Sequence, residues 1–290
     1  MAFRTRFAPS PTGPLHLGHA YSAFLAHDMA RANDGTFMVR IEDIDQSRAR
    51  PKWEDQIYDD LSWLDLSWDE PVLRQSTRAP AYQDALTKLW ADGVLFPCDC
   101  TRRDISEAVS APQENEPTIG PDGLIYPGTC RHHAPSYPNL PMPDNKALRL
   151  LMSRAITRLR EDLPLGFNER IFGNTSTVRV DESDLASTIG DIVLSRRDMG
   201  TSYHLSVVLD DAAQGITDVV RGEDLFEATK IHVVLQRLLG LATPTYHHHR
   251  LIRDDAGKRL AKRNDARAIR TYRDAGASPA DIRQMVGLSA

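Results

Sequence analysis

The chain has 290 residues, of which 41% are hydrophobic and 26% are charged, and its formal net charge is −5. It is therefore long enough for one large domain or two small ones with a substantial core. No apolar run approaches the roughly 20 residues of a membrane-spanning helix, and the first residues lack the apolar stretch of a secretory signal, so we expect a cytoplasmic protein without a membrane partner.

Charge is unevenly distributed along the chain. Residues 42–70 hold ten Asp and Glu against three Lys and Arg, whereas residues 249–274 hold nine Lys and Arg against four Asp. The net charge predicts no general attraction to nucleic acid, but the basic segment could meet a polyanion. The three cysteines are an odd number, which does not predict a disulfide framework and suits a reducing compartment.

The first predicted elements form a β-α-β unit. Residues 4–10 and 36–44 are rich in β-favouring residues and predict strands, and residues 20–34 between them predict a helix. A loop rich in proline and glycine joins the first strand to this helix. The helix N-terminus is therefore expected at the carboxyl edge of a sheet, where α/β proteins hold phosphates with free backbone N–H groups.

His16 and His19 stand at the start of this helix, in the sequence HLGH, with Gly18 between them. Imidazoles placed there can donate hydrogen bonds to phosphate oxygens, and the glycine lets a flat base approach the backbone. The alternative is that the two histidines are a helix cap and a surface residue. The basic cluster GKRLAKR at 257–263 favours the phosphate site, because its cations could stabilise a phosphoryl transition state; alone, it would indicate a solvated face.

Several further segments are predicted from pattern. A second helix is expected over residues 77–93, and the proline-rich residues 106–145 are expected to form an irregular insertion, after which regular structure resumes at 147–153. Two apolar runs flank Gly215 within residues 201–225, and we predict strands on either side of a turn. The three histidines at 247–249 predict a polar strand or a loop edge.

Cys98, Cys100 and Cys130 fall in or beside the predicted insertion. Soft thiolates in tetrahedral geometry favour zinc, and three cysteines need a fourth ligand. Spacing alone makes His132 or His133 the natural choice, because imidazole is a far commoner zinc ligand than phenolate. A metal-free cluster of buried thiols is the alternative.

Two motifs resemble those of a known family. RFAPSPTGPLHLGHA at 6–20 resembles the HIGH signature of class I aminoacyl-tRNA synthetases, and RLAKR at 259–263 resembles a degenerate form of their KMSKS loop. The segments RIEDID at 40–45, LSWDE at 66–70 and VVRGEDL at 219–225 resemble the glutamyl-tRNA synthetase group. The resemblance covers nearly the whole chain. Only 27 residues follow the KMSKS-like loop, too few for the anticodon-binding domain of that group, so a shortened relative matches better.

The resemblance implies an α/β fold, a Rossmann-like class I catalytic domain with an inserted zinc-containing subdomain and no anticodon-binding domain. It divides the chain into a first catalytic half with the HIGH-like motif (1–97), an insertion with the zinc cluster (98–174), a second catalytic half (175–242) and a segment with the KMSKS-like loop and short C-terminal helices (243–290).

The resemblance also implies residue roles. His16, His19 and Lys262 would be catalytic, and Gly18 and Arg259 would join them in binding ATP. Carboxylates would be held by arginine and the ammonium by Glu42, whereas surface ion pairs and solvent exposure are the alternatives for these charges. The glutamate-binding set would be Arg6, Phe7, Ala8, Pro9, Ser10, Glu42, Tyr203 and Arg221. Tyr126, instead of a histidine, would complete the metal site of Cys98, Cys100 and Cys130.

Two positions depart from the family pattern. Val207 stands where full-length synthetases usually have asparagine, which predicts a different and weaker grip on glutamate. In the KMSKS-like loop, Arg259 replaces the first lysine and Ala261 replaces the serine. Arginine keeps the charge, and the missing hydroxyl removes at most one hydrogen bond, worth about 0.5–1.5 kcal/mol, so activity is still expected.

The implied activity is activation of L-glutamate with ATP and Mg²⁺, followed by attachment of glutamate to the queuosine base in the anticodon of tRNA(Asp). One structural Zn²⁺ and a monomeric state are expected. Three other readings stay open: glutamylation of the 3′ end of tRNA(Glu), a catalytically silent paralogue that binds ATP, glutamate or RNA, and a small-molecule adenylyltransferase with the same fold. RIEDID and VVRGEDL argue against the last of these.

Overall fold

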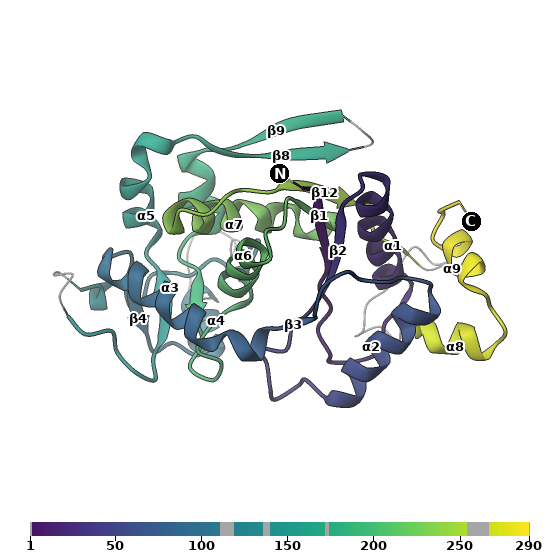
Figure 1. Ribbon diagram of the computed structural model, residues 1–290. Coiled ribbons are helices and arrows are strands. Elements are labelled where there is room, and N and C mark those ends of the chain that lie inside the picture. The colour runs from purple at the N-terminus through teal and green to yellow at the C-terminus, as the bar shows by residue number, and fades with distance from the viewer. Residues whose placement is uncertain (1, 111–118, 136–139, 172–173, 254–266, 290) are drawn as a thin grey trace.

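The structure is a computed structural model that describes residues 2–110, 119–135, 140–171, 174–253 and 267–289 (Figure 1). Its helices are α1 (Leu17–Ala32), α2 (Pro51–Trp63), α3 (Ala79–Ala91), α4 (Arg102–Ser110), α5 (Met152–Arg158), α6 (Tyr203–Ala213), α7 (Phe226–Leu239), α8 (Ile269–Asp274) and α9 (Pro279–Met285). Its strands are β1 (Arg4–Phe7), β2 (Thr36–Ile41), β3 (Leu73–Arg74), β4 (Leu95–Cys98), β5 (Ile119–Gly120), β6 (Gly123–Leu124), β7 (Ala147–Leu150), β8 (Leu165–Ile171), β9 (Asn174–Val180), β10 (Val193–Ser195), β11 (Asp218–Gly222) and β12 (Thr245–His249). None of the described helices is both long enough and apolar enough to span a membrane.

Two groups of parallel strands lie side by side. β1, β2 and β3 are parallel neighbours; β11, β12 and β8 form a second parallel group, with β9 antiparallel at its edge. Arg4 joins the groups, because its backbone N–H donates to the Thr217 hydroxyl at 2.9 Å and its carbonyl accepts from the Thr217 N–H at 3.1 Å. α1 connects β1 to β2, which confirms the predicted β-α-β unit, and α7 connects β11 to β12 in the same way.

The apolar run before Gly215 is helix α6, so the strand predicted there is wrong. The helix begins after Ser202, whose hydroxyl caps it by accepting a hydrogen bond from the Leu205 N–H at 3.4 Å. Seven of its eleven residues are buried. A helix buried on most sides lacks a solvent-facing polar stripe, so its sequence does not show the helical spacing of apolar and polar residues that marks a surface helix. Gly215 does form a turn, with φ of +63°, and the strand predicted after it is β11.

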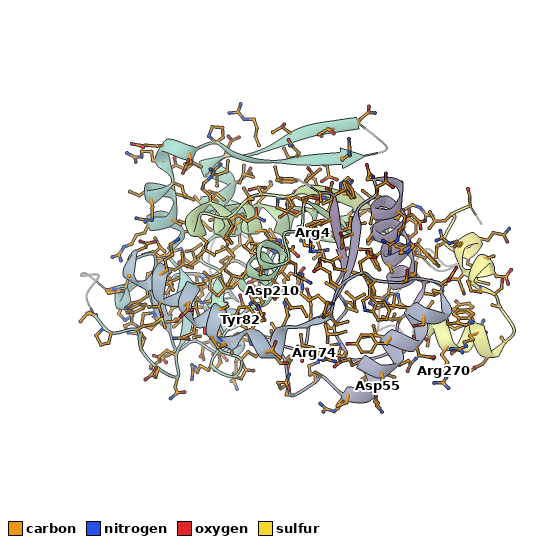
Figure 2. The ribbon with its side chains drawn as sticks, in the orientation of Figure 1. Arg4, Asp55, Arg74, Tyr82, Asp210 and Arg270 are labelled. Atoms are coloured by element: carbon orange, nitrogen blue, oxygen red, sulfur yellow. The ribbon has the colours of Figure 1, made fainter. Side chains whose placement is uncertain are left out.

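Asp210 anchors α6 to the predicted second helix, which the structure confirms as α3. The Tyr82 hydroxyl donates to Asp210 Oδ2 at 2.7 Å, and Gln75 Nε2 donates to the same oxygen at 2.9 Å. Arg78 Nε donates to Asp210 Oδ1 at 3.2 Å. Figure 2 shows Tyr82 and Asp210 close together between these helices. A buried carboxylate with three donors fixes α6, which carries the next residue, Asp211, toward the site described below.

The histidines at 247–249 lie on strand β12, which confirms the predicted polar strand. β12 is an inner strand, between β11 and β8. Two of the histidines meet buried carboxylates: His247 Nε2 lies 2.8 Å from Asp218 Oδ1, and His248 Nδ1 lies 2.6 Å from Glu169 Oε2. These partners allow polar side chains to occupy the interior of a sheet.

The core consists of two main apolar clusters. The larger one is enclosed by α3, α5, α6 and α7, and the smaller one lies around α1, β2 and α2. The smaller cluster also holds Ile269, Ile282 and Val286 from the C-terminal segment. The last two helices, α8 and α9, therefore pack beside the first β-α-β unit, as Figure 1 shows at the right of the molecule.

The predicted insertion contains only short elements in its described part. Within residues 106–145 these are the end of α4, the hairpin of β5 and β6, and one turn of helix at Arg131–His133. The antiparallel strands β4, β7 and β10 lie at its base. The four-part division of the chain stays a prediction. The strand β8 falls in the range given to the insertion, but it pairs with β12 in the second group of parallel strands.

Asp60 of α2 is a buried carboxyl whose ionisation weakens the fold. Its side chain is 0% exposed, and neither of its carboxylate oxygens has a hydrogen-bond partner of ordinary geometry among the described residues. Burial, assisted by the negative charge of Asp59, raises the pKa of Asp60 to about 6. The folded protein therefore binds the proton of the Asp60 carboxyl more tightly than the unfolded chain does. The contribution of protonated Asp60 to the free energy of unfolding is fully present below about pH 4 and is lost as the pH rises through the folded pKa.

We expect Asp60→Asn to raise the free energy of unfolding by about 1–3 kcal/mol above pH 7 and to leave it nearly unchanged at about pH 4. Denaturant unfolding of parent and variant at both pH values measures the difference. Asp55→Asn is the matched control, because Asp55 is an exposed aspartate on the same helix. Equal stabilities of Asp60→Asn and parent at high pH would contradict the prediction.

Candidate active site

His16 and His19 form a reciprocal cap at the start of α1. His16 Nδ1 accepts a hydrogen bond from the Gly18 N–H at 3.1 Å, and His19 Nδ1 accepts one from the His16 N–H at 3.1 Å. The ring centroids are 3.8 Å apart. Because Nδ1 accepts in both rings, each neutral imidazole carries its proton on Nε2. The cap therefore fixes the tautomer in which Nε2–H can donate to a phosphate oxygen.

The His16 ring occupies the space beside Gly18 that a side chain at this position would need. A Cβ added to Gly18 would lie 3.1 Å from His16 Cε1 and 3.2 Å from His16 Nδ1, closer than side chains usually pack. A larger residue at this position would therefore require the His16 ring to shift slightly.

The C-terminal segment pairs with the residues at the start of α1. Ala268 forms an antiparallel bridge with His16, and the Ile269 N–H donates to the Leu15 carbonyl at 2.9 Å. Ala268 follows closely after residues 254–266, which lie outside the described part of the chain. The predicted ATP-binding residues Arg259 and Lys262 fall in that range, so their roles stay predictions.

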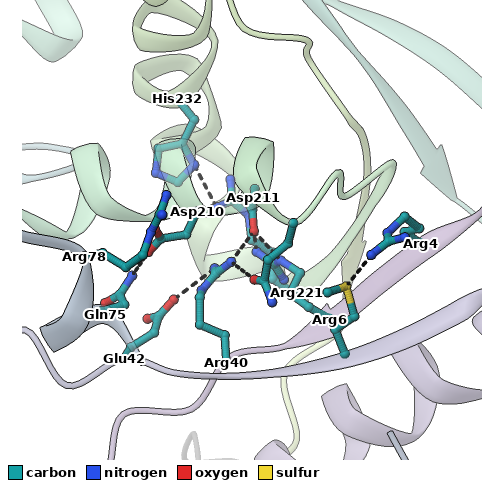
Figure 3. A network of polar contacts seen from close by, with 12 residues as sticks. Arg4, Arg6, Arg40, Glu42, Gln75, Arg78, Asp210, Asp211, Arg221 and His232 are labelled. Carbon is teal, nitrogen blue, oxygen red and sulfur yellow. Dashed lines mark hydrogen bonds and ion pairs between the residues drawn. The ribbon is translucent and has the colours of Figure 1, made fainter. Parts of the chain in front are cut away.

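Arg6 and Arg40 meet at the carboxylate of Asp211, and Arg40 links this carboxylate to Glu42 (Figure 3). Arg6 donates to both Asp211 oxygens, at 2.9 and 3.2 Å, and Arg40 donates to Asp211 Oδ1 at 2.6 Å. Arg40 also reaches Glu42 Oε1 at 3.2 Å. Arg6 thus holds a carboxylate, as its predicted role requires, but that carboxylate belongs to the protein.

The two carboxyls of this network differ in their pKa. Burial would raise the pKa of Asp211, but the guanidinium groups of Arg6 and Arg40 outweigh burial and lower it to about 2. Burial raises the pKa of Glu42, and the charges of Arg40 and Arg6 only partly offset this effect. A cation beside Glu42 would therefore favour its ionised form, which is the behaviour expected of an ammonium-binding carboxyl.

Arg221 is held differently, by neutral acceptors. Its Nε donates to His248 Nε2 at 3.2 Å, one terminal nitrogen contacts His232 Nδ1 at 3.1 Å, and the other donates to the Leu225 carbonyl at 3.3 Å and to the Thr229 hydroxyl. The residue is 5% exposed, and within the described ranges no carboxylate forms an ion pair with it. The Arg221 guanidinium is thus held in one orientation and shielded from water, and no carboxylate of the described residues neutralises its charge.

A cavity of about 990 Å³ extends from Glu42 to the cysteine cluster. Ser10, Glu42 and Tyr203 line one part of it, and Cys98, Cys100 and Tyr126 line another. The structure brings these predicted residues to one cavity, whereas Arg6, Arg221, His16, Gly18 and His19 are not in its lining.

Two members of the segment 6–10 are buried away from the cavity. The Phe7 side chain belongs to the smaller apolar cluster, and Pro9 is buried with its carbonyl accepting from the Glu42 N–H at 3.0 Å. Ala8 is half-buried. These three residues position Ser10 and Glu42, because they fix the backbone that carries both.

The three cysteine sulfurs form a cluster within 4.8 Å of one another, without a disulfide. The Tyr126 hydroxyl lies 3.5 Å from both Cys98 Sγ and Cys100 Sγ and accepts from the Cys130 N–H at 2.8 Å. No histidine of the described chain joins the cluster, and the spacing candidates His132 and His133 are exposed. Arg149 covers the Tyr126 ring, 3.9 Å from its centroid, and donates to Cys98 Sγ at 3.3 Å. This donor set and its cationic cover fit a thiophilic divalent ion.

Sequence reasoning missed the partners that orient the arginines. Asp211, Glu169 and His232 are buried. Arg6 and Asp211 are 205 positions apart and His248 and Glu169 are 79 apart, whereas Arg221 and His232 are only 11 apart but lie on different elements. The available signal was two successive aspartates inside an apolar run, because such charges are buried only when they are paired.

Residues 2–289 match the family described as tRNA synthetases class I (E and Q), catalytic domain. The chain belongs to this family. This class I synthetase chain is 61% identical, over 98% of its own length and 99% of the other, to a Rhodobacter capsulatus protein named glutamyl-Q tRNA(Asp) synthetase. A Geobacter sulfurreducens protein of the same name is 39% identical, over 93% of this chain and 78% of that protein.

Solved structures show the same class I synthetase fold. A glutamate tRNA ligase from Elizabethkingia meningosepticum, in complex with its amino acid, has a TM-score of 0.72 and 26% identity. The match covers 99% of this chain and 60% of that ligase, so the chain spans less than two thirds of its length. Methionyl-tRNA synthetase from Mycobacterium tuberculosis, bound by methionyl-adenylate, has a TM-score of 0.58 and 11% identity, which shows the fold alone.

Proposed function

We propose that this chain is a ligase that activates L-glutamate with ATP and transfers it to the queuosine base in the anticodon of tRNA(Asp). The observation that carries the proposal is 61% identity to a protein named glutamyl-Q tRNA(Asp) synthetase over nearly the full length of both chains. The arrangement of Glu42, Tyr203 and Arg221 supports it, because these groups match the charges and polar atoms of glutamate.

Glutamate carries one ammonium and two carboxylates, and the chain offers a counterpart for each. Glu42 lines the cavity, and Arg6 and Arg221, which lie outside its lining, are close enough to act on the pKa of Tyr203 there. Arg221 binds the side-chain carboxylate, since it is the buried cation held by neutral acceptors. Glu42 binds the ammonium. Arg6 meets the α-carboxylate, because Arg6 and Arg40 share the single carboxylate of Asp211, which orients both guanidinium groups but cannot cancel both charges. The Ser10 and Tyr203 hydroxyls line the cavity and add hydrogen bonds. Val207 is buried in α6 and supplies no amide, so fewer hydrogen bonds hold the ligand than in full-length synthetases.

In the first step the α-carboxylate of glutamate attacks the α-phosphorus of ATP in line. A carboxyl oxygen–phosphorus bond forms, the bond to the bridging oxygen breaks, and pyrophosphate leaves with that electron pair. The Nε2–H groups of His16 and His19 donate to the phosphate oxygens, and Lys262 and Arg259 add positive charge. Mg²⁺ bound with ATP would neutralise the leaving pyrophosphate.

In the second step a hydroxyl of the cyclopentene ring of queuosine attacks the carbonyl of glutamyl-adenylate. An ester bond forms, the mixed anhydride breaks, and AMP leaves. An anticodon base must be turned out of its loop to reach this carbonyl, which is the usual way in which proteins bind single-stranded bases.

Labelled glutamate and ATP test this proposal directly. We expect glutamate-dependent ATP/pyrophosphate exchange without any tRNA, because the groups assigned to glutamate all belong to this chain. We expect transfer of glutamate to tRNA(Asp) that carries queuosine and none to the unmodified tRNA. Exchange that requires tRNA would overturn the first part, and glutamate on the 3′-terminal adenosine of tRNA(Glu) would replace the proposed acceptor.

The cysteine cluster is proposed to hold one structural Zn²⁺ through Cys98, Cys100, Cys130 and Tyr126. Zinc bound there would tie β4 to the turn at 126–130 and so shape the far wall of the cavity. No catalytic step needs it, because no chemistry occurs at the sulfurs. The geometry favours Tyr126 over a histidine, since its hydroxyl is already within 3.5 Å of two thiols.

Metal analysis is expected to find about one zinc per chain in protein prepared without added zinc. Cys98→Ser and Cys130→Ser should lose the metal. Tyr126→Phe should release it to a chelating dye much faster than the parent, whereas His132→Ala and His133→Ala are the matched controls and should release it at the parent rate. If Tyr126→Phe retains zinc and a histidine variant loses it, the tyrosine assignment is wrong.

A further inference from the structure

A chain of side-chain hydrogen bonds runs from Arg221 to the hairpin of β5 and β6. His232 of α7 is 1% exposed and lies 3.1 Å from the Arg221 terminal nitrogen through Nδ1. Its Nε2 lies 3.2 Å from His204 Nδ1. His204 Nε2 lies 3.3 Å from Oδ1 of Asp122, which stands at the turn of the hairpin. Figure 3 shows His232 pointing from its helix toward Arg221.

The residues at the two ends of this series of hydrogen bonds, Arg221 and Asp122, fix the direction of every hydrogen bond in it. Arginine only donates, so His232 Nδ1 must accept and the His232 proton must be on Nε2. That proton is donated to His204 Nδ1, which leaves the His204 proton on Nε2, directed at Asp122. The Asp122 carboxylate only accepts, so donors and acceptors alternate without conflict from one end to the other.

We infer that Asp122, His204 and His232 form a relay of positioning residues that aims Arg221 at the side-chain carboxylate of glutamate. The inference rests on the proposed function. It means that the insertion, which carries Asp122, contributes to glutamate recognition without touching glutamate.

The chemistry of the relay explains why histidine suits this position. A carboxylate beside Arg221 would orient it equally well but would cancel the charge that the ligand needs. A neutral imidazole accepts the hydrogen bond and leaves the charge available. Burial, followed by the Arg221 charge, lowers the pKa of His232, which keeps the ring neutral. His248 serves the other side of Arg221 in the same manner, with its Nδ1 directed at Glu169.

The relay should therefore affect discrimination between glutamate and glutamine. An uncancelled, correctly aimed guanidinium favours a carboxylate over an amide of the same shape, because the amide leaves the buried charge without a counter-ion. A guanidinium that has lost its His232 contact is still held by His248, Leu225 and Thr229 through its other nitrogens, but the terminal nitrogen that His232 held is no longer fixed. Binding of glutamate should then weaken more than binding of the amide.

Substitutions at His232 test the inference through the exchange reaction. His232→Phe removes the acceptor, and we expect the KM for glutamate to rise roughly tenfold or more, with kcat and the KM for ATP nearly unchanged and with discrimination against glutamine reduced. His232→Asn keeps an oxygen near the position of Nδ1 and should restore most of the affinity. Asp122→Ala should raise the KM for glutamate by roughly two- to fivefold, and Asp122→Asn, which keeps an acceptor, by less.

His247→Asn is the matched control, because His247 is a buried histidine bonded to Asp218 and outside the relay. A parental KM for glutamate in His232→Phe would overturn the inference. So would an equal rise in His247→Asn, which would indicate a general effect on folding. If the parent shows no glutamate-dependent exchange, the proposed function fails, and this result is distinct from a failure of the relay.

Histidine tautomers give a readout that does not depend on activity. In protein labelled with ¹⁵N-histidine, NMR spectra are expected to show His232 and His204 as neutral rings protonated on Nε2, and Asp122→Ala should shift the His204 signals first. A ring protonated on Nδ1 at His232 would overturn the relay, because it could not accept from Arg221.

Discussion

Replacing His19 by asparagine is expected to lower the rate of glutamate-dependent ATP/pyrophosphate exchange by about 100-fold, the loss typical of a donor aimed at transition-state charge. Asparagine keeps an oxygen that can accept from the His16 N–H, so the cap of α1 survives, while the Nε2–H donor is removed. The thermal midpoint should therefore stay near that of the parent. Exchange rates at saturating ATP and glutamate measure the effect.

His27→Asn is the matched control for this variant. His27 lies on the same helix, near its other end, where its Nδ1 contacts Asp28 at 3.3 Å, and it should tolerate the same substitution with a parental exchange rate. Lys262→Ala, in the KMSKS-like loop, should lose as much activity as His19→Asn. If both lose less than about tenfold, these motifs are not the phosphate site that stabilises the transition state.

The first β-α-β unit could be predicted because its signals are local. β-Branched and aromatic residues, then a loop of proline and glycine, then helix-forming residues determine β1, α1 and β2 with little help from the rest of the chain. α6 shows the opposite case. It packs against α3, α7 and β10, and this burial replaces the polar stripe that would have identified a helix.

Some residues of the candidate site could likewise be predicted from local sequence, whereas the partners of others are brought together only by the fold. His16, Gly18 and His19 act within one helical turn, so the sequence contains their geometry. Arg221 could be identified as a cation from its motif, but its neutral partners His232 and His248 come from α7 and β12, and only the fold brings them together. The fourth metal ligand was ambiguous for a related reason. Spacing favoured His132 or His133, whereas the resemblance favoured Tyr126, whose hydroxyl the fold carries to the thiols.

An anticodon stem-loop of tRNA(Asp) that bears queuosine is expected to accept glutamate without the rest of the tRNA. The acceptor hydroxyl belongs to the modified base, so a short RNA contains every atom that reacts. The RNA should end in a 3′-phosphate, which removes the terminal diol that a tRNA(Glu) ligase would use. Labelled glutamate recovered with this RNA measures transfer.

The same stem-loop with guanine in place of queuosine is the matched control and should give only background label, because guanine has no hydroxyl. Prior oxidation with periodate should also abolish transfer, since the cyclopentene diol is then the only vicinal diol in the RNA. Transfer should weaken steeply with salt if the nine Lys and Arg of residues 249–274 meet phosphates. Label on the guanine control would show that glutamate goes to an internal ribose hydroxyl. A requirement for a tRNA with a free 3′ end would place glutamate on the terminal adenosine, and either result would overturn the queuosine acceptor.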